Sequence, residues 1–359
     1  MTFDAAADTL EALRLNRVEG FPDELLETSP LDLWRHLPGP TLFHVPGRRT
    51  EPLFVTVLLH GNEWTSWEAI QTVLKAHRAT PLPRSLLLFA GNIAAARANV
   101  RTLPHQTDYN RTWPGTPHTA TAEARVMADV TEIVRRAKPF ASIDIHNNTG
   151  LNPHYAVVNR LDQEALHLAL LFSRTVVWFR GLAGTQTTAF SSLCPALTIE
   201  CGKPGRAANE AHATSFIEAC LHLAQFPAHS VRESDIDLYH TVATVRVPPQ
   251  TSFGFGDALA DVDFDPQLDH MNFRQLDPGT VFGHTRLQLP IDVRDEGGQD
   301  VTAEFFDCSE GMIRLRRAAT PAMLTLDERV VRQDCLCYLM ERLPLPRREN
   351  AAPELCASF

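Results

Sequence analysis

The sequence has no long apolar run, little cysteine and no excess of positive charge. None of its 359 residues belongs to an uninterrupted apolar stretch of about 18 residues, the length that a membrane-spanning helix needs. Residues 1–20 lack the basic segment and the apolar segment of a signal peptide. The net charge is −10, from 33 basic and 43 acidic side chains, so we expect no general binding to nucleic acid or to an anionic membrane.

The cysteines exclude a second class of protein. There are seven of them, an odd number, thinly spread and without a C-x-x-C pair. Small secreted proteins held by disulfides have an even and regularly spaced set. Hydrophobic residues make up 44% and charged residues 21% of the chain, which excludes a mostly disordered protein. We therefore predict a soluble, cytoplasmic, globular protein with reduced thiols.

The part of the chain from residue 53 to residue 226 alternates between two periodicities. Near-continuous apolar runs, typical of strands buried on both faces, occupy residues 53–60, 85–92, 140–146, 155–159 and 195–200. Helical patterns lie among them, in residues 67–74, 122–138, 161–173 and 207–226. This order predicts an α/β fold with a mixed, mostly parallel sheet and flanking helices.

The pattern of the sequence changes after residue 226, where the helical periodicity fades. Prolines and the Gly297–Gly298 pair divide the chain into short segments, of which residues 239–247 and 312–315 have strand patterns. We therefore predict two domains, an α/β domain in residues 1–226 and a smaller β-rich domain in residues 227–359.

Candidate metal ligands stand at the ends of two predicted strands. His60 and Glu63 follow the first strand directly, and His146 closes the third. Zinc prefers such nitrogen and carboxylate donors, and a catalytic zinc site has three protein ligands and one open position. Asp144 lies on the same strand face as His146, where a carboxylate can orient a ligand imidazole.

The remaining candidates are a glutamate and a loop with arginines. Glu200 ends an otherwise apolar strand, a costly position for a carboxylate without a task. Near zinc it could take a proton from the attacking water. Arg111, with Asn110, could hold a substrate carboxylate, and Arg101 could stabilise a carbonyl oxygen that becomes negative.

Each of these signals is common by chance, but their order along the chain is specific. The ordered segments are HGNE (60–63), GN with DYNRTWPG (91–92 and 108–115), DIHNNTG (144–150) and TIECG (198–202). They resemble the zinc carboxypeptidase superfamily and, within it, the succinylglutamate desuccinylase/aspartoacylase branch. The resemblance covers roughly residues 50–225 and, more loosely, a β-rich C-terminal domain.

The resemblance implies a role for each matching residue. It implies one Zn²⁺ per chain held by His60, Glu63 and His146. It also implies that Asn110 and Arg111 bind the substrate carboxylate, that Arg101 polarises the scissile carbonyl, and that Glu200 is the general base.

One departure from the family pattern concerns the acyl group. Aspartoacylase-like members carry an arginine shortly before the catalytic glutamate, which meets a second substrate carboxylate. Here residues 188–192 hold no basic residue, and Phe190 lies near the expected place. We therefore expect neutral or aromatic acyl groups rather than acidic ones, with Arg180 as the one nearby cation that could restore acid recognition.

The sequence thus predicts a zinc-dependent hydrolase that cleaves an amide bond in a small substrate with a free carboxylate. An N-acyl amino acid deacylase and a metallocarboxypeptidase acting on peptides need the same residues, so both stay open. A non-catalytic metal-binding or ligand-binding protein on the same scaffold is the third alternative. The oligomeric state stays open as well.

Overall fold

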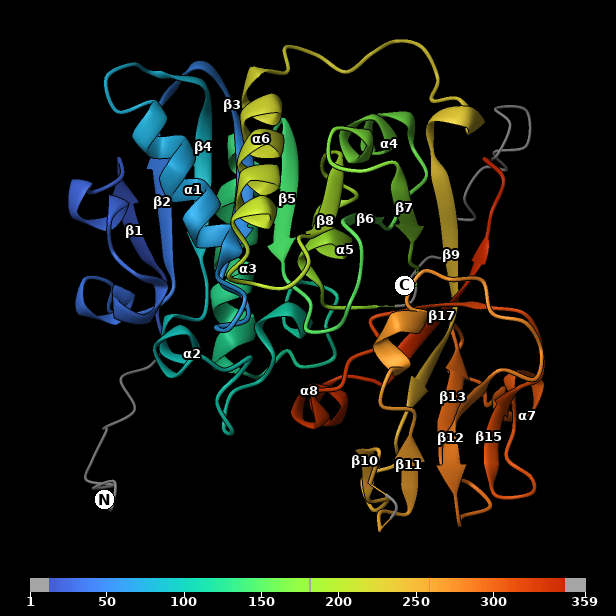
Figure 1. Cartoon of the computed structure of the whole chain (residues 1–359). Coiled ribbons are helices and arrows are strands. Elements are labelled where there is room, and N and C mark those ends of the chain that lie inside the picture. Colours follow the sequence, from blue (N-terminus) through green and yellow to red (C-terminus); the bar gives the residue numbers. More distant parts are fainter. Residues whose placement is uncertain (1–12, 181, 258, 346–359) are drawn as a thin grey trace, which may run out of the picture.

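The computed structural model describes residues 13–180, 182–257 and 259–345, which form a large sheet with flanking helices and a separate small sheet (Figure 1). No helix in these ranges is long and apolar enough to cross a membrane. The six cysteines they contain are free. Cys356 and residues 1–12, which entered the predictions above, lie outside the described residues.

The large sheet has 12 strands and holds the middle of the chain at its centre. In spatial order its strands are β1 (Asn16–Glu19), β2 (Thr41–Val45), β4 (Leu82–Ala90), β3 (Gly47–Val57), β5 (Ala141–His146), β8 (Ala196–Glu200), β6 (Tyr155–Val158), β7 (Thr175–Trp178), β9 (Asp237–Arg246), β17 (Cys337–Arg342) and β16 (Thr320–Ala322), with β13 (Asp292–Asp295) also paired to β9. β4, β3, β5 and β8 are parallel, whereas β6 runs antiparallel to β8. The predicted fold class is confirmed.

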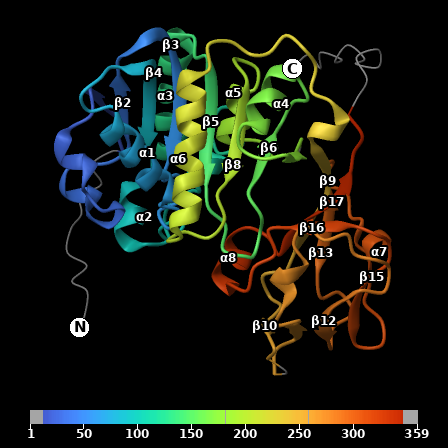
Figure 2. The ribbon, with the colours of Figure 1, turned by 45° about the horizontal axis from the view of Figure 1, so that its top comes forward.

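Helices cover both faces of this sheet, since β3 and β4 carry apolar side chains on both sides. α1 (Thr65–Ala76), α4 (Gln163–Leu170) and α6 (Ala207–His222) pack on the face that contains Leu53 and Val55. α3 (Ala122–Ala137) and α5 (Gln186–Phe190) pack on the opposite face with Phe54. Figure 2 shows α1 and α6 lying side by side along the first face.

Shorter helices connect these elements. α2 (Ile93–Ala98) follows β4, and five 3₁₀ helices are η1 (Asp23–Leu26), η2 (Pro30–Arg35), η3 (Tyr109–Arg111), η4 (Glu233–Asp235) and η5 (Leu268–Met271). The Asn92 side chain accepts a hydrogen bond from the Ala95 amide and so caps α2, and Thr121 caps α3 through the Ala124 amide. The sequence patterns did not predict β1, β2, β7 or α5, which are short.

The C-terminal part adds a five-stranded sheet of its own. Its order is β10 (Phe253–Phe255), β11 (Val262–Phe264), β12 (Val281–Thr285), β15 (Met312–Leu315) and β14 (Phe306–Asp307), and α7 (Thr302–Phe305) and α8 (Glu328–Gln333) lie in the same half of the chain. Yet β9, β13, β16 and β17 belong to the large sheet. The division into domains at residue 226 therefore stays a prediction.

Candidate active site

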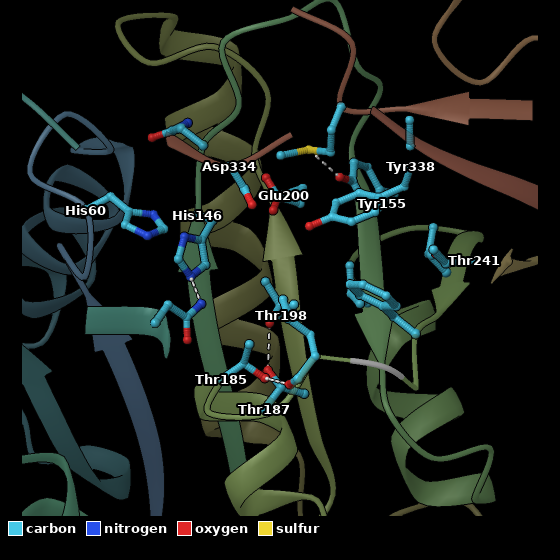
Figure 3. A pocket seen from close by; sticks show the side chains of 18 of the residues that line it. His60, His146, Tyr155, Thr185, Thr187, Thr198, Glu200, Thr241, Asp334 and Tyr338 are labelled. Atoms are coloured by element: carbon cyan, nitrogen blue, oxygen red, sulfur yellow. Dashed lines mark hydrogen bonds between the residues drawn. The ribbon is translucent and has the colours of Figure 1, made fainter. Parts of the chain in front are cut away.

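A pocket lies on the large sheet, on the face that α3 and α5 cover (Figure 3). The pairing register explains which side chains line it. His146 on β5 is paired with Glu200 on β8, and Glu200 is paired with Tyr155 on β6. Because residues paired across a sheet point to the same side, these three side chains face one space. β9 and β17 extend the lining with Thr241 and Tyr338.

At one end of the pocket, three possible metal-binding side chains converge. Nδ1 of His60 lies 2.9 Å from one carboxylate oxygen of Glu63, and Nδ1 of His146 lies 2.7 Å from the other. One donor atom from each of the three residues lies within 4.8 Å of the other two, and all three side chains are buried. The geometry suits a single metal ion held by two imidazoles and a carboxylate.

The other ring nitrogen of each imidazole, Nε2, contacts a carboxylate. His60 Nε2 lies 3.0 Å from Asp108 Oδ1, and His146 Nε2 lies 2.8 Å from Asp144 Oδ2. A carboxylate on the far nitrogen fixes the ring orientation and the tautomer of a metal-binding histidine. Both Nδ1 atoms are thereby directed to the space beside Glu63. We predicted from the sequence that Asp144 orients a ligand imidazole, but we did not predict the corresponding role of Asp108.

The electrostatics of this group favour a cation. Burial alone would lower the pKa of His146, but Asp144 and Glu63 raise it well above its usual value. Burial alone would raise the pKa of Glu63, yet the imidazoles of His60 and His146 hold it well below its usual value. The surrounding carboxylates thus stabilise positive charge at the point where the donor atoms meet.

The local backbone explains why His60 points into the site. Leu58, at the end of β3, has a φ of 55°, in the left-handed region, which turns the chain out of the sheet. Gly61 then passes so close to α2 that a Cβ there would lie 2.1 Å from the carbonyl carbon of Ala95. A glycine is required at this contact, which holds the HGNE turn against α2.

Glu200 lies beside the three converging side chains. It is 8% exposed, and the Asn148 side-chain amide donates a hydrogen bond of 3.3 Å to its carboxylate. Burial raises the pKa of Glu200 to about 7, although nearby His146 opposes the shift. A metal cation bound at the neighbouring group would lower that pKa, so the carboxylate would be ionised and able to accept a proton at neutral pH.

The two arginines of the predicted site lie together at the pocket wall. Arg101 donates to Asp108 Oδ2 over 3.0 Å, and its Nη1 lies 3.6 Å from Glu63. Arg111 donates to its neighbour's backbone, the carbonyl of Asn110, over 2.9 Å. Both guanidinium groups also contact Asp334, a residue that follows α8 and that we did not predict at this site.

Asn110 has its amide occupied by the protein. Its Nδ2 donates to Asp144 Oδ2 over 3.0 Å and lies 3.0 Å from His146 Nε2, while its Oδ1 accepts from the Gln186 amide over 2.9 Å. In this arrangement Asn110 connects the metal-binding group to the start of α5. Its predicted contact with a substrate carboxylate stays a prediction.

The neutral wall of the pocket comes from residues other than those expected. Phe190 is fully buried in the core against Phe54 and Trp113, so it does not line the pocket, and that expectation was wrong. Arg180 is exposed and lies over the Trp178 ring. The wall is instead formed by apolar and hydroxyl side chains, mainly Val157, Val177, Phe179, Leu182, Thr185, Thr187, Thr198, Thr241 and Met340.

Other histidines have partners elsewhere. His154 stacks on His212, with ring centroids 4.5 Å apart, and contacts Asn209. His77 and His222 meet Glu218 between α1 and α6, a grouping that the sequence did not predict because His77 lies 141 residues from Glu218 in the chain.

The contact between Asp144 and His146 predicts a metal-affinity effect. Asp144→Asn should weaken metal binding about 10–100-fold, because an amide holds the imidazole less firmly than a carboxylate. Competition with a chelator measures this affinity. Ser142→Ala is the matched control, since Ser142 lies two residues earlier on the same face and its hydroxyl accepts a hydrogen bond from Gln186. An equal loss in both variants would contradict the proposed role of Asp144.

Comparisons with known proteins relate this chain to one family. Residues 50–226 match the family model of the succinylglutamate desuccinylase/aspartoacylase catalytic domain. Among curated proteins, no sequence relative was found.

Solved structures share the fold at low sequence identity. Succinylglutamate desuccinylase from Chromobacterium violaceum is 17% identical with a TM-score of 0.55, over 84% of this chain and 87% of that one. A succinylglutamate desuccinylase/aspartoacylase from Rhodobacter sphaeroides is 15% identical with a TM-score of 0.56, over 84% and 88%. Murine aminoacylase 3 is 18% identical with a TM-score of 0.54, over 83% and 98%. Residues 50–226 of the chain thus match the catalytic domain of the succinylglutamate desuccinylase/aspartoacylase family, whose members hydrolyse amide bonds, and the chain shares the fold of solved structures that carry these names.

Proposed function

We propose that this protein is a zinc-dependent amidohydrolase, located in the cytoplasm, that removes a neutral acyl group from a small N-acyl amino acid. The observation that carries the proposal is the convergence of His60, Glu63 and His146 beside Glu200, in a pocket whose far wall has no charge. The match to this family supports the amide as the bond that is cleaved.

The donor set fits zinc. Two imidazole nitrogens and one carboxylate are typical ligands of a catalytic zinc ion, and each imidazole here has a carboxylate on its other nitrogen. We infer that His60, Glu63 and His146 hold one zinc ion per chain. A zinc ion there supplies Lewis-acid polarisation of the scissile carbonyl and lowers the pKa of water to about 7.

Side chains of the protein carry out proton transfer, stabilise the developing charge and bind the substrate. Glu200 accepts the proton of the attacking water and later returns it to the leaving amine. Arg101, whose guanidinium lies 3.6 Å from Glu63, stabilises the negative charge that develops on the carbonyl oxygen. Arg111 binds the substrate carboxylate, with Asn110 as its neighbour in the same loop, and so fixes the amide in the reactive position.

A substrate panel with a zinc assay tests this proposal. We expect about one zinc ion per chain and turnover of N-acyl amino acids, with short peptides as the alternative substrates. Turnover of peptides alone would favour a carboxypeptidase. Stoichiometric zinc without turnover of either class would favour a non-catalytic protein.

The pocket wall predicts which acyl groups are preferred. Among the described residues that line the pocket, the permanent cations are Arg101 and Arg111, at the metal end. A second carboxylate on the acyl group would lose its water without gaining a partner. N-acetyl and N-benzoyl amino acids should therefore exceed the N-succinyl derivative of the same amino acid by at least about tenfold in kcat/KM.

Arg180→Ala is the control for this preference. Because Arg180 is exposed and lies over Trp178, its removal should leave the ratio of acidic to neutral substrates unchanged. A tenfold preference for the acidic acyl group, abolished in this variant, would contradict the interpretation.

A further inference from the structure

Asp334 contacts both Arg101 and Arg111, and the proposed hydrolysis assigns it no role. It stands 223 residues after Arg111 in the chain, directly after α8 and three residues before β17. Its Oδ1 accepts a hydrogen bond of 3.1 Å from Arg111 Nη2, and its Oδ2 lies 3.6 Å from Arg101 Nη2. A segment near the C-terminus thus places a carboxylate at the arginines of the pocket (Figure 3).

Asp334 occupies the place beside Arg111 that a substrate carboxylate would need. A guanidinium binds carboxylates from its own protein and from a ligand with the same N–H groups. Arg101 is already engaged by Asp108, and Asp334 contacts both arginines. A second carboxylate on Arg111 would therefore meet a like charge at close range, or would have to take the place of Asp334.

The backbone around Asp334 is held in place. Its amide donates to the Val330 carbonyl over 2.9 Å, and the amide of Leu336 donates to Val245 over 2.8 Å. Cys335 and Leu336 are buried, and β17 pairs with β9 in the large sheet. The backbone thus keeps the Asp334 carboxylate within reach of the arginines, and only a rotation of the side chain could move it away without disrupting this packing.

We propose that Asp334 is a specificity-determining residue that competes with the substrate carboxylate for Arg111 and Arg101. It lowers the affinity of the site for carboxylate-bearing substrates relative to neutral ones of the same shape. This inference rests on the proposed function, because it takes Arg111 as the group that binds the substrate carboxylate. The opposite role, in which Asp334 orients Arg111 for the substrate, predicts effects of opposite sign.

Kinetics on a matched pair of substrates separate the two roles. For the best N-acyl amino acid of the panel and its carboxamide, Asp334→Asn should raise kcat/KM of the acid about tenfold, through KM, and change the amide less than about twofold. A fall in kcat/KM of the acid would show that Asp334 positions Arg111. An unchanged ratio of acid to amide would show that it has neither role.

Two further variants serve as controls. Asp327→Asn removes the carboxylate that caps α8, which accepts hydrogen bonds from the amides of Arg329 and Val330, and should leave the ratio of acid to amide unchanged. In an Arg111→Ala background, the gain from Asp334→Asn should largely disappear, because the two residues then no longer compete through the same group. A full gain in that background would contradict the proposal.

A binding measurement tests the role of Asp334 without relying on the proposed hydrolysis. Calorimetry with N-benzoylglycine and with its carboxamide, in a Glu200→Gln background that does not turn the acid over, measures binding alone. We expect Asp334→Asn in this background to bind the acid about tenfold more tightly than Glu200→Gln alone, with no such gain for the carboxamide. Equal affinity in both proteins, or no binding by either, would overturn the inference. Failure of the substrate panel alone would count against the amidohydrolase instead.

Discussion

Replacing Glu200 with Gln is expected to lower kcat by about 10²–10⁴-fold while metal content and KM stay close to native. An amide has the shape of the carboxylate but cannot accept the proton of the attacking water. Glu200 closes β8 in register with His146, so its carboxylate lies next to the metal-binding group without belonging to it.

Steady-state kinetics with a zinc assay on the same preparation measure this effect. Glu210→Gln makes the same chemical change on α6, where Glu210 accepts a hydrogen bond from Thr72, and should leave kcat unchanged. Near-native kcat in Glu200→Gln would remove this residue from the mechanism. A parallel loss of zinc would instead make Glu200 part of the metal site.

Replacing His146 with Ala should remove both the metal and the activity. It deletes one of three ligands and leaves the Glu63 carboxylate without its 2.7 Å partner. The fold should survive, because the pairing of β5 with β3 and β8 uses backbone groups and the apolar neighbours on β5 remain. We expect zinc to fall from about one ion per chain to a small fraction after dialysis against a chelator.

Elemental analysis and circular dichroism together check this result. His154→Ala is the control, because His154 is also a histidine near the site loops but stacks on His212 outside the pocket. That variant should keep its zinc. Stoichiometric zinc in His146→Ala, with a native spectrum, would rule out the proposed ligand set.

Much of the fold could be predicted because its signals are local. The strands β3, β4, β5 and β8 contain short apolar runs, and the apolar faces of α1 and α3 follow from the helical spacing of their residues. The HGNE and DIHNNTG segments stand where such strands end. In a parallel sheet these ends meet at one edge, so the strand order alone favours a single site for His60, Glu63 and His146.

The rest of the site was decided by contacts between distant segments. Asp108 lies in a loop, and only the folded loop brings its carboxylate to His60 and Arg101. Phe190 looked like a pocket residue in the sequence, but the single turn of α5 directs it into the core beside Trp113.

The position of Asp334 beside the two arginines could not be predicted from the sequence. The types of chemical group at the strand ends, and the fold class that brings them together, could be predicted from the sequence. A lone aspartate after a short helix has no periodicity or motif, and its side chain reaches the arginines only because β17 pairs with β9. Tertiary structure alone decided which carboxylate meets Arg111, since sheet pairing depends on the packing of the whole domain and not on neighbouring residues.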